Sequence, residues 1–144
     1  MFKIQPIQNK TEQENAAVRC GVPYLPDAMA YAAEIDGAFS GICQFSIRGE
    51  HGMIHHLVPL PGVDDYEVMF IMGRATMNFI DLCGIHTCLC DKNAGDPKLL
   101  RAIGFTDNGG KLLFADMTDM FNGKHCASKQ KPESKTKSSA ETDA

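Results

Sequence analysis

Residues 29–58 read MAYAAEIDGAFSGICQFSIRGEHGMIHHLV, and the arrangement of strands in the chain follows from them. Asp36 and Gly37 stand between two apolar runs, and an Asp-Gly pair favours the two-residue turn of a β-hairpin. The residues GEHG at 49–52 mark a second turn, which is followed by a third apolar run at residues 53–58. The whole stretch therefore predicts a three-stranded antiparallel meander.

A short strand and a helix are expected before the meander. Residues 2–5 alternate apolar and polar side chains, which is typical of a strand. Residues 11–20 favour a helix only weakly, and Gly21 with Pro23 ends it.

A strand–helix–strand unit is expected after the meander. Prolines end the third strand of the meander, and either Asp64 or Asp65 can cap a long helix over residues 66–82. Apolar side chains lie nearly all round this helix, so we expect it to be largely buried. Residues 85–90 form the next strand, which should run parallel to the strand before the helix because a helical crossover joins them.

The remaining elements complete a single domain. Pro97 begins a further helix, and residues 111–115 form a last strand. The order of elements predicts an α/β (α+β) fold, with a mixed, mostly antiparallel twisted sheet flanked by helices. We expect this domain to span residues 1–122. Residues 123–144 are rich in Lys and Ser and contain no large apolar residue, so they are predicted to form a disordered tail.

The overall composition argues against several classes of function. The net charge is −4, so we expect no broad basic surface for nucleic acid. No apolar run approaches the roughly 20 residues that a membrane-spanning helix needs, and the first ten residues lack the apolar segment of a signal peptide. We therefore expect a cytoplasmic protein that binds neither nucleic acid nor membrane.

The cysteines are expected to be buried, reduced thiols, because most lie among apolar neighbours: Cys20, Cys43, Cys83, Cys88 and Cys90. A metal or redox protein is the competing interpretation. His86, Cys88 and Cys90 share one face of the predicted strand, but neighbours on one face lie about 7 Å apart along a strand, which suits a tetrahedral ion poorly. We therefore predict no metal site.

Three short motifs resemble one family when their order is considered. IDGAFSGICQF at residues 35–45 is similar to the strand–turn–strand pattern xDGxxVGxxxl, and IHHLVP at 54–59 resembles the pattern L-x-V-x-P. NAGDPKLLRAIGF at 93–105 resembles N-x-x-A-x-x-L-Y-x-K-x-G-F. Over residues 2–121 the chain thus resembles the GCN5-related N-acetyltransferase (GNAT) superfamily.

The resemblance implies that acetyl-CoA or another acyl-CoA is bound and that its acyl group passes to a small-molecule or peptide amine. In that family the fourth and fifth strands splay apart, and the pantetheine arm lies between them. Backbone groups of the fourth strand hold the arm as an added strand would be held. The corresponding cofactor-binding residues here are His56, Leu57 and Val58, together with Asn93 from the third motif.

The chain departs from the family pattern at two places. The pyrophosphate loop R/Q-x-x-G-x-G/A is replaced by LPGVDDYE at residues 60–67, which places the carboxylates of Asp64, Asp65 and Glu67 at the start of a helix. Those carboxylates stabilise the helix end but repel the phosphates of CoA. In many members of the family a Tyr four residues before the Gly-Phe pair protonates the leaving thiolate. The corresponding residue here is Leu100, which carries no proton to donate.

His55, His56 and Glu50 are the catalytic candidates, because they surround the expected substrate edge and could accept a proton from an ammonium substrate. Adjacent residues of a regular strand point to opposite faces, so only one of His55 and His56 is expected to face the cleft. Two functions follow: an acyl-CoA-dependent N-acyltransferase with an altered hold on the cofactor, or a non-catalytic GNAT-like module that binds a ligand or a partner.

Overall fold

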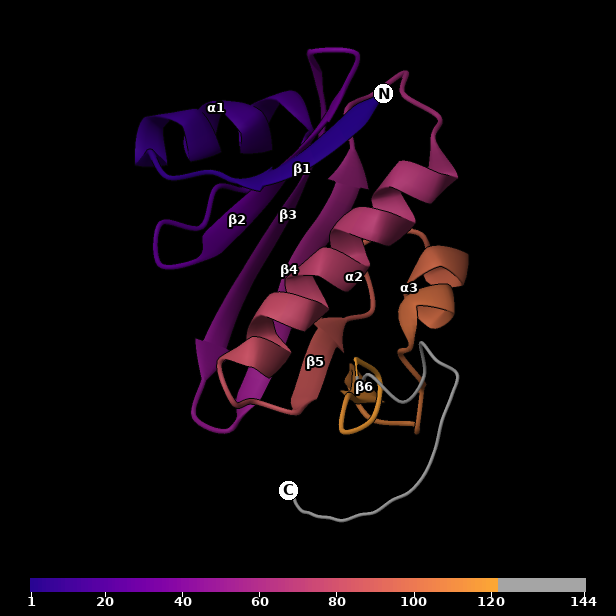
Figure 1. The fold of residues 1–144 in the computed structure, drawn as a ribbon. Coiled ribbons are helices and arrows are strands. Elements are labelled where there is room, and N and C mark those ends of the chain that lie inside the picture. The colour runs from indigo at the N-terminus through magenta and orange to yellow at the C-terminus, as the bar shows by residue number, and fades with distance from the viewer. Residues whose placement is uncertain (122–144) are drawn as a thin grey trace.

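Six strands and three helices make up the part of the chain that the computed structural model describes, residues 1–121 (Figure 1). The predicted tail at residues 123–144 lies outside the described residues. In chain order the elements are β1 (Phe2–Pro6), α1 (Lys10–Arg19), β2 (Met29–Ile35), β3 (Ala38–Arg48), β4 (His51–Pro59), α2 (Tyr66–Leu82), β5 (Thr87–Asp91), α3 (Pro97–Ile103) and β6 (Leu112–Asp116).

The strands form one sheet in the order β1-β2-β3-β4-β5-β6. Every neighbouring pair is antiparallel except β4 and β5, which are parallel because α2 carries the chain back to the opposite end of the sheet. The predicted fold class is therefore confirmed: the sheet is mixed, mostly antiparallel and flanked by helices.

The β2–β3 hairpin turns through two residues, as its sequence predicts. Asp36 and Gly37 have φ values of 51° and 84°, and the flanking residues Ile35 and Ala38 are paired. Positive φ at both central positions matches the right-handed twist of the two strands, and Gly adopts it without strain. The meander predicted from residues 29–58 is thereby confirmed.

The helices cover the two faces of the sheet unequally. Neighbouring residues of β3 belong to different apolar clusters: Cys43 lies in the larger cluster with α2 and α3, whereas Ile42 lies in a smaller one with α1. Because successive strand residues point to opposite faces, α1 lies on the face opposite to α2 and α3. In Figure 1, α2 runs diagonally across the sheet with α3 beside it.

Helix α2 has the predicted bounds, but only the face that packs on the sheet is fully buried, and Tyr66 and Leu82 at its ends are exposed. Val68, Met72, Met77 and Ile80 are all buried against the sheet. The Asp65 carboxylate accepts a hydrogen bond from the backbone N–H of Val68 at 3.1 Å, so Asp65 is the N-cap. None of the helices in residues 1–121 is both long and apolar enough to cross a bilayer.

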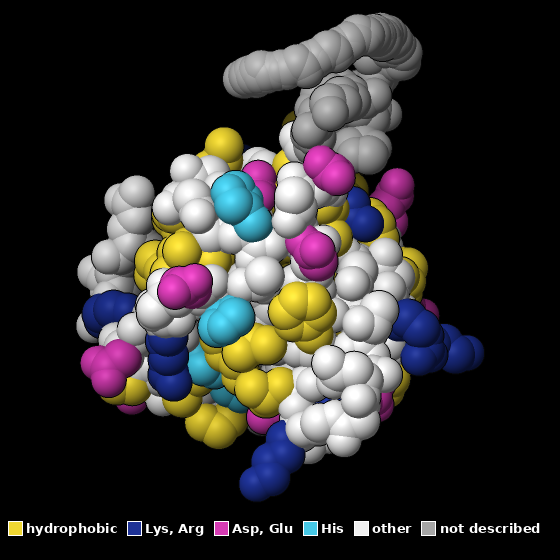
Figure 2. Space-filling view, turned by 90° about the horizontal axis from the view of Figure 1, so that it is seen from below, with side chains coloured by type: hydrophobic (Ala, Val, Ile, Leu, Met, Phe, Trp, Pro, Cys, Tyr) yellow, Lys and Arg dark blue, Asp and Glu magenta, His cyan; other side chains and the backbone are white. Residues whose placement is uncertain are grey.

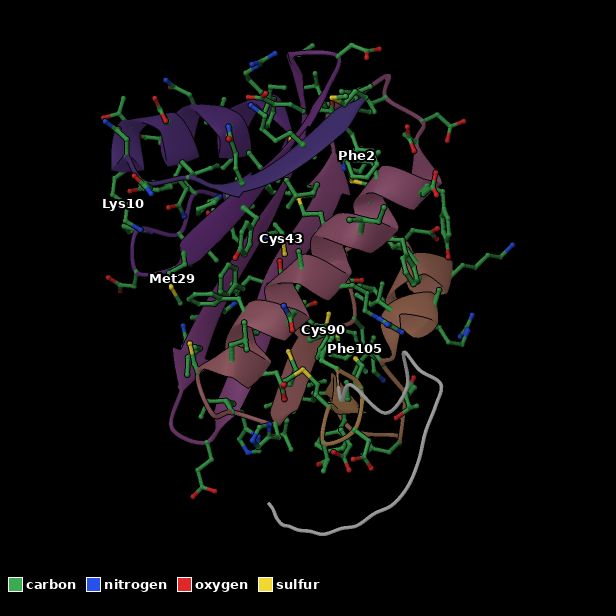
Figure 3. The ribbon with its side chains drawn as sticks, viewed as in Figure 1. Phe2, Lys10, Met29, Cys43, Cys90 and Phe105 are labelled. Atoms are coloured by element: carbon green, nitrogen blue, oxygen red, sulfur yellow. The ribbon has the colours of Figure 1, made fainter. Side chains whose placement is uncertain are left out.

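The cysteines follow the expectation with one exception. Cys20, Cys43, Cys88 and Cys90 are buried. Cys83 is exposed, contrary to prediction, because it is the C-cap of α2 and lies beyond the last turn that packs on the sheet. In Figure 3 the labelled Cys43 and Cys90 lie under α2, in the interior.

Replacing Leu100 by Ala tests the larger core. Leu100 is fully buried, so Leu100→Ala should lower the free energy of unfolding by about 2–5 kcal/mol. The matched change Leu82→Ala, at a side chain that is 76% exposed, should alter it by about 0.5 kcal/mol or less. Urea unfolding measures both, and equal losses in the two variants would contradict the packing described here.

Candidate functional site

Strand β4 carries one extra residue opposite β3. Gln44 pairs with His56 and Phe45 pairs with Ile54, so His55 has no partner in the register. This is a β-bulge, which resets the alternation of side chains along the strand.

The bulge places both imidazoles on one face of the sheet. His55 Nε2 lies 2.7 Å from Ser46 Oγ, and His56 Nδ1 lies 2.9 Å from Gln44 Nε2. Ser46 and Gln44 are two apart in β3 and share a face. Ile54 and Leu57, on either side of the histidines, both point into the core under α2. The expectation that His55 and His56 point to opposite faces is therefore wrong, because it assumed a regular strand.

A buried amide network fixes the His56 ring. The Gln44 oxygen accepts hydrogen bonds from the backbone N–H of Leu25 at 3.1 Å and from Gln13 Nε2 at 3.0 Å. The Gln44 nitrogen therefore faces the other way and donates to Pro23 O and to His56 Nδ1. Since Nδ1 accepts, the neutral His56 ring carries its proton on Nε2.

Both imidazoles favour the neutral form. Burial lowers the pKa of His55, and the Arg48 charge lowers it further. Burial likewise lowers the pKa of His56, and the Asp91 carboxylate opposes the shift in both. Each ring can thus accept a proton at neutral pH. Glu50 lies exposed in the turn before β4, outside the contacts that hold the two histidines.

Strands β4 and β5 separate after three residue pairs, which run from Gly52 with Cys88 to Ile54 with Cys90. His56, Leu57 and Val58 therefore lie where β4 has left β5, as the family resemblance predicts. The Leu57 N–H donates to the carbonyl of Ala94 at 2.7 Å. Asn93 precedes Ala94 and lies beside the separated strands, where its N–H donates to the Asp91 carboxylate at 2.7 Å.

A small hollow of about 120 Å³ remains between the end of β4 and the first turns of α2 and α3. Its apolar and aromatic lining residues are Leu57, Pro59, Val63, Tyr66, Met69 and Leu99, and its carboxylates are Asp64, Asp65 and Asp96. Two of these carboxylates cap helices, since Asp65 accepts from Val68 N and Asp96 from Lys98 N. The hollow is therefore apolar inside and acidic at its edge.

Comparison with known proteins identifies the fold. No protein-family model and no curated protein sequence matches the chain. Among solved structures, a PaiA N-acetyltransferase from Thermoplasma acidophilum in complex with coenzyme A aligns with a TM-score of 0.62 and 12% identity, over 81% of this chain and 99% of that one. A GNAT family acetyltransferase from Brucella melitensis in complex with acetyl-CoA aligns with a TM-score of 0.61 and 16% identity, over 81% of this chain and 88% of that one.

A third structure agrees with the first two. The ribosomal-protein-S18-alanine N-acetyltransferase from Escherichia coli has a TM-score of 0.62 at 9% identity, over 81% of this chain and 94% of that one. The chain has the GNAT fold. At these identities the GNAT fold itself is the shared property.

The residues of this GNAT-fold chain do not fit CoA. Asp64 and Asp65 lie at the start of α2, where the resemblance places the pyrophosphate, and residues 60–67 contain no Lys or Arg. Arg74 cannot substitute, since its Nε donates to Ile103 O at 2.8 Å and its guanidinium stacks on Phe70. The hollow, at about 120 Å³, is smaller than the roughly 300–1,000 Å³ of typical ligand pockets.

The cysteines of the GNAT-fold core offer no reactive thiolate. Burial raises the pKa of Cys43 and of Cys88 to about 12, and it raises that of Cys90 as well. Residues 1–121 contain no group of three or more His, Cys, Asp or Glu side chains that could hold a metal ion. Figure 2 shows imidazoles and carboxylates spread over the face seen from below. Outside the pair on β4, His51 Nδ1 lies 2.7 Å from Thr87 Oγ1, and His86 Nδ1 lies 2.6 Å from Asp81 Oδ1.

Sequence reasoning missed the residues that position the histidines. Gln13, Gln44 and Ser46 are buried polar side chains in segments that are otherwise apolar or helical. A glutamine within an apolar strand is a signal of this kind, because a buried amide requires partners. The identity of the partners could not be read from the pattern.

The pH dependence of stability tests the histidine environment. His55 and His56 bind a proton less tightly in the folded chain than in the unfolded chain, so protonation favours unfolding. We expect the free energy of unfolding to fall as the pH drops below about 6.5, the ordinary pKa of histidine, until the lowered folded-state values are passed.

The double variant His55→Gln/His56→Gln should lose much of this fall. His51→Gln removes one exposed imidazole and is the control. Urea unfolding at several pH values from 5 to 8 measures how steeply the free energy of unfolding changes with pH. The two ends of this range lie about one to two pH units from the ordinary pKa of histidine. A double variant with the wild-type slope would contradict the assignment.

Proposed function

We propose that this protein is a non-catalytic GNAT-fold module that binds a ligand other than CoA. The observation that carries the proposal is the set of carboxylates at the start of α2, where Asp64 and Asp65 take the position of the family's glycines and basic residue. A polyphosphate brought there meets like charges, and each contact costs free energy instead of supplying it. The loop pattern of the resembling family has glycines and a basic residue at this position instead of carboxylates.

The charge and shape of the hollow favour an ammonium group on a short apolar body. Leu57, Met69 and Leu99 supply apolar contacts, and Asp64 supplies a carboxylate that caps no helix. A ligand this small has few atoms in contact, so we expect weak affinity, in the millimolar range. A small-molecule amine or the amine of a peptide side chain has this chemistry.

A set of ligands that share one alkyl chain tests the proposal. n-Butylammonium should shift the amide resonances of Tyr66 and Met69 in an NMR titration, whereas butanol and butyrate should shift them little. Asp64→Asn should weaken n-butylammonium binding about fivefold, as expected for loss of about 1 kcal/mol from an exposed ion pair. Asp27→Asn, at an exposed carboxylate outside the hollow, is the matched control.

Acetyl-CoA provides the opposing arm of this experiment. Calorimetry should detect no binding of acetyl-CoA up to about 1 mM. Micromolar binding of acetyl-CoA beside Asp64 and Tyr66 would overturn the proposal.

An acyl-CoA-dependent N-acyltransferase is the second candidate, and the β4 bulge favours it. His55 and His56 lie on one face, both favour the neutral form and both could accept a proton from an ammonium acceptor. In this case thiol should be released from acetyl-CoA when an amine is added. His56→Gln should then lower kcat about 100-fold with KM for acetyl-CoA unchanged, while His51→Gln retains activity.

A further inference from the structure

We propose that residues 93–95 permanently occupy the gap between β4 and β5, where they take the place that an extended ligand arm would need. The inference deepens the proposed function, on which its interpretation as a closed cofactor groove rests. Backbone hydrogen bonding and steric contact at Leu57 support this filled gap, and the charges at the start of α2 play no part in it.

Both backbone polar groups of Leu57 face this segment. Its N–H donates to Ala94 O at 2.7 Å, and its carbonyl oxygen lies against Gly95. Leu57 and Ala94 are fully buried, so no water competes for the hydrogen bond. A ligand that pairs with Leu57 must first break this buried bond, which leaves the Ala94 carbonyl buried without a partner.

Gly95 makes this close approach sterically possible. A Cβ atom at position 95 would lie 2.4 Å from the Leu57 carbonyl oxygen, which is a backbone atom and cannot swing aside. The φ of Gly95 is not in the left-handed region, so the glycine is required for space and not for its backbone conformation. Any larger residue must displace either this segment or β4.

The segment is held at both ends. Asp91 accepts hydrogen bonds from Asn93 N through its carboxylate and from Ala94 N through its carbonyl, at 2.7 and 3.0 Å. Lys92 forms an ion pair with Asp107 at 3.3 Å, and α3 begins directly after the Asp96 cap. A connection this short between β5 and α3 cannot leave the gap without breaking these contacts. The gap is thus filled by the chain itself.

Hydrogen exchange at the Leu57 amide tests the inference on the full chain. In the wild type this amide should exchange as slowly as that of Cys43 in the core. Gly95→Ala should displace residues 93–95 and speed exchange at Leu57 about tenfold or more, while Cys43 stays protected. Gly110→Ala is the matched control, because a Cβ there meets only Asn108 Oδ1, at 3.6 Å.

Two results would overturn the inference. One is a Leu57 amide that exchanges in the wild type as fast as an exposed amide. The other is Leu57 protection that is equal in Gly95→Ala and Gly110→Ala. If Gly95→Ala loses protection at Cys43 as well, the variant has unfolded globally. The wild-type exchange rate of Leu57 and the pantetheine titration below then decide whether the gap is filled.

Pantetheine separates this inference from the proposed function. It carries no phosphate, so the carboxylates of Asp64 and Asp65 do not repel it, and only the filled gap excludes it. We expect no shift of the Leu57 resonance when pantetheine is added to the wild type. Pantetheine binding at Leu57 without CoA binding would refute the filled gap and leave the charge argument standing, whereas CoA binding beside Asp64 would refute the proposed function.

Discussion

The bulge at His55 is the constraint on which the rest of the site depends. One extra residue in β4 changes which side chains face α1 and which face α2. It brings His55 and His56 to one face, and the parallel pairing with β5 ends at the residue before it. The gap beside Leu57 and the polar network under α1 both begin at this position.

The two ends of the expected cofactor groove are altered by different physical means. At the start of α2, Asp64 and Asp65 place negative charge where the family resemblance places the pyrophosphate. Beside β4, Ala94 and Gly95 use hydrogen bonding and van der Waals contact to take the place of an uncharged arm. A chain under selection for CoA binding would gain from neither change. Their occurrence in one groove therefore supports a function in which the fold is kept and the cofactor is not.

Much of the fold could be predicted because its signals are local. The Asp36-Gly37 turn, the proline-bounded strand and the apolar repeat of α2 depend on residues close together in the chain, and the predicted bounds of β2, β3 and α2 agree with the structure. The bulge could not be predicted, because residues 53–58 come as two apolar, two polar and two apolar side chains, so regular alternation fails throughout and marks no single position. The register of β4 depends on the residues of β3 as well as on its own, so the sequence of β4 alone cannot locate the bulge.

The sequence by itself determined the order of the elements, the turns between strands and the acidic start of α2, since each follows from neighbouring residues and their backbone preferences. Only the tertiary structure decided which face His55 and His56 share, and that Ala94 bonds Leu57. These features arise where segments remote in the chain meet, and the energy of a buried hydrogen bond depends on a partner that no local pattern names.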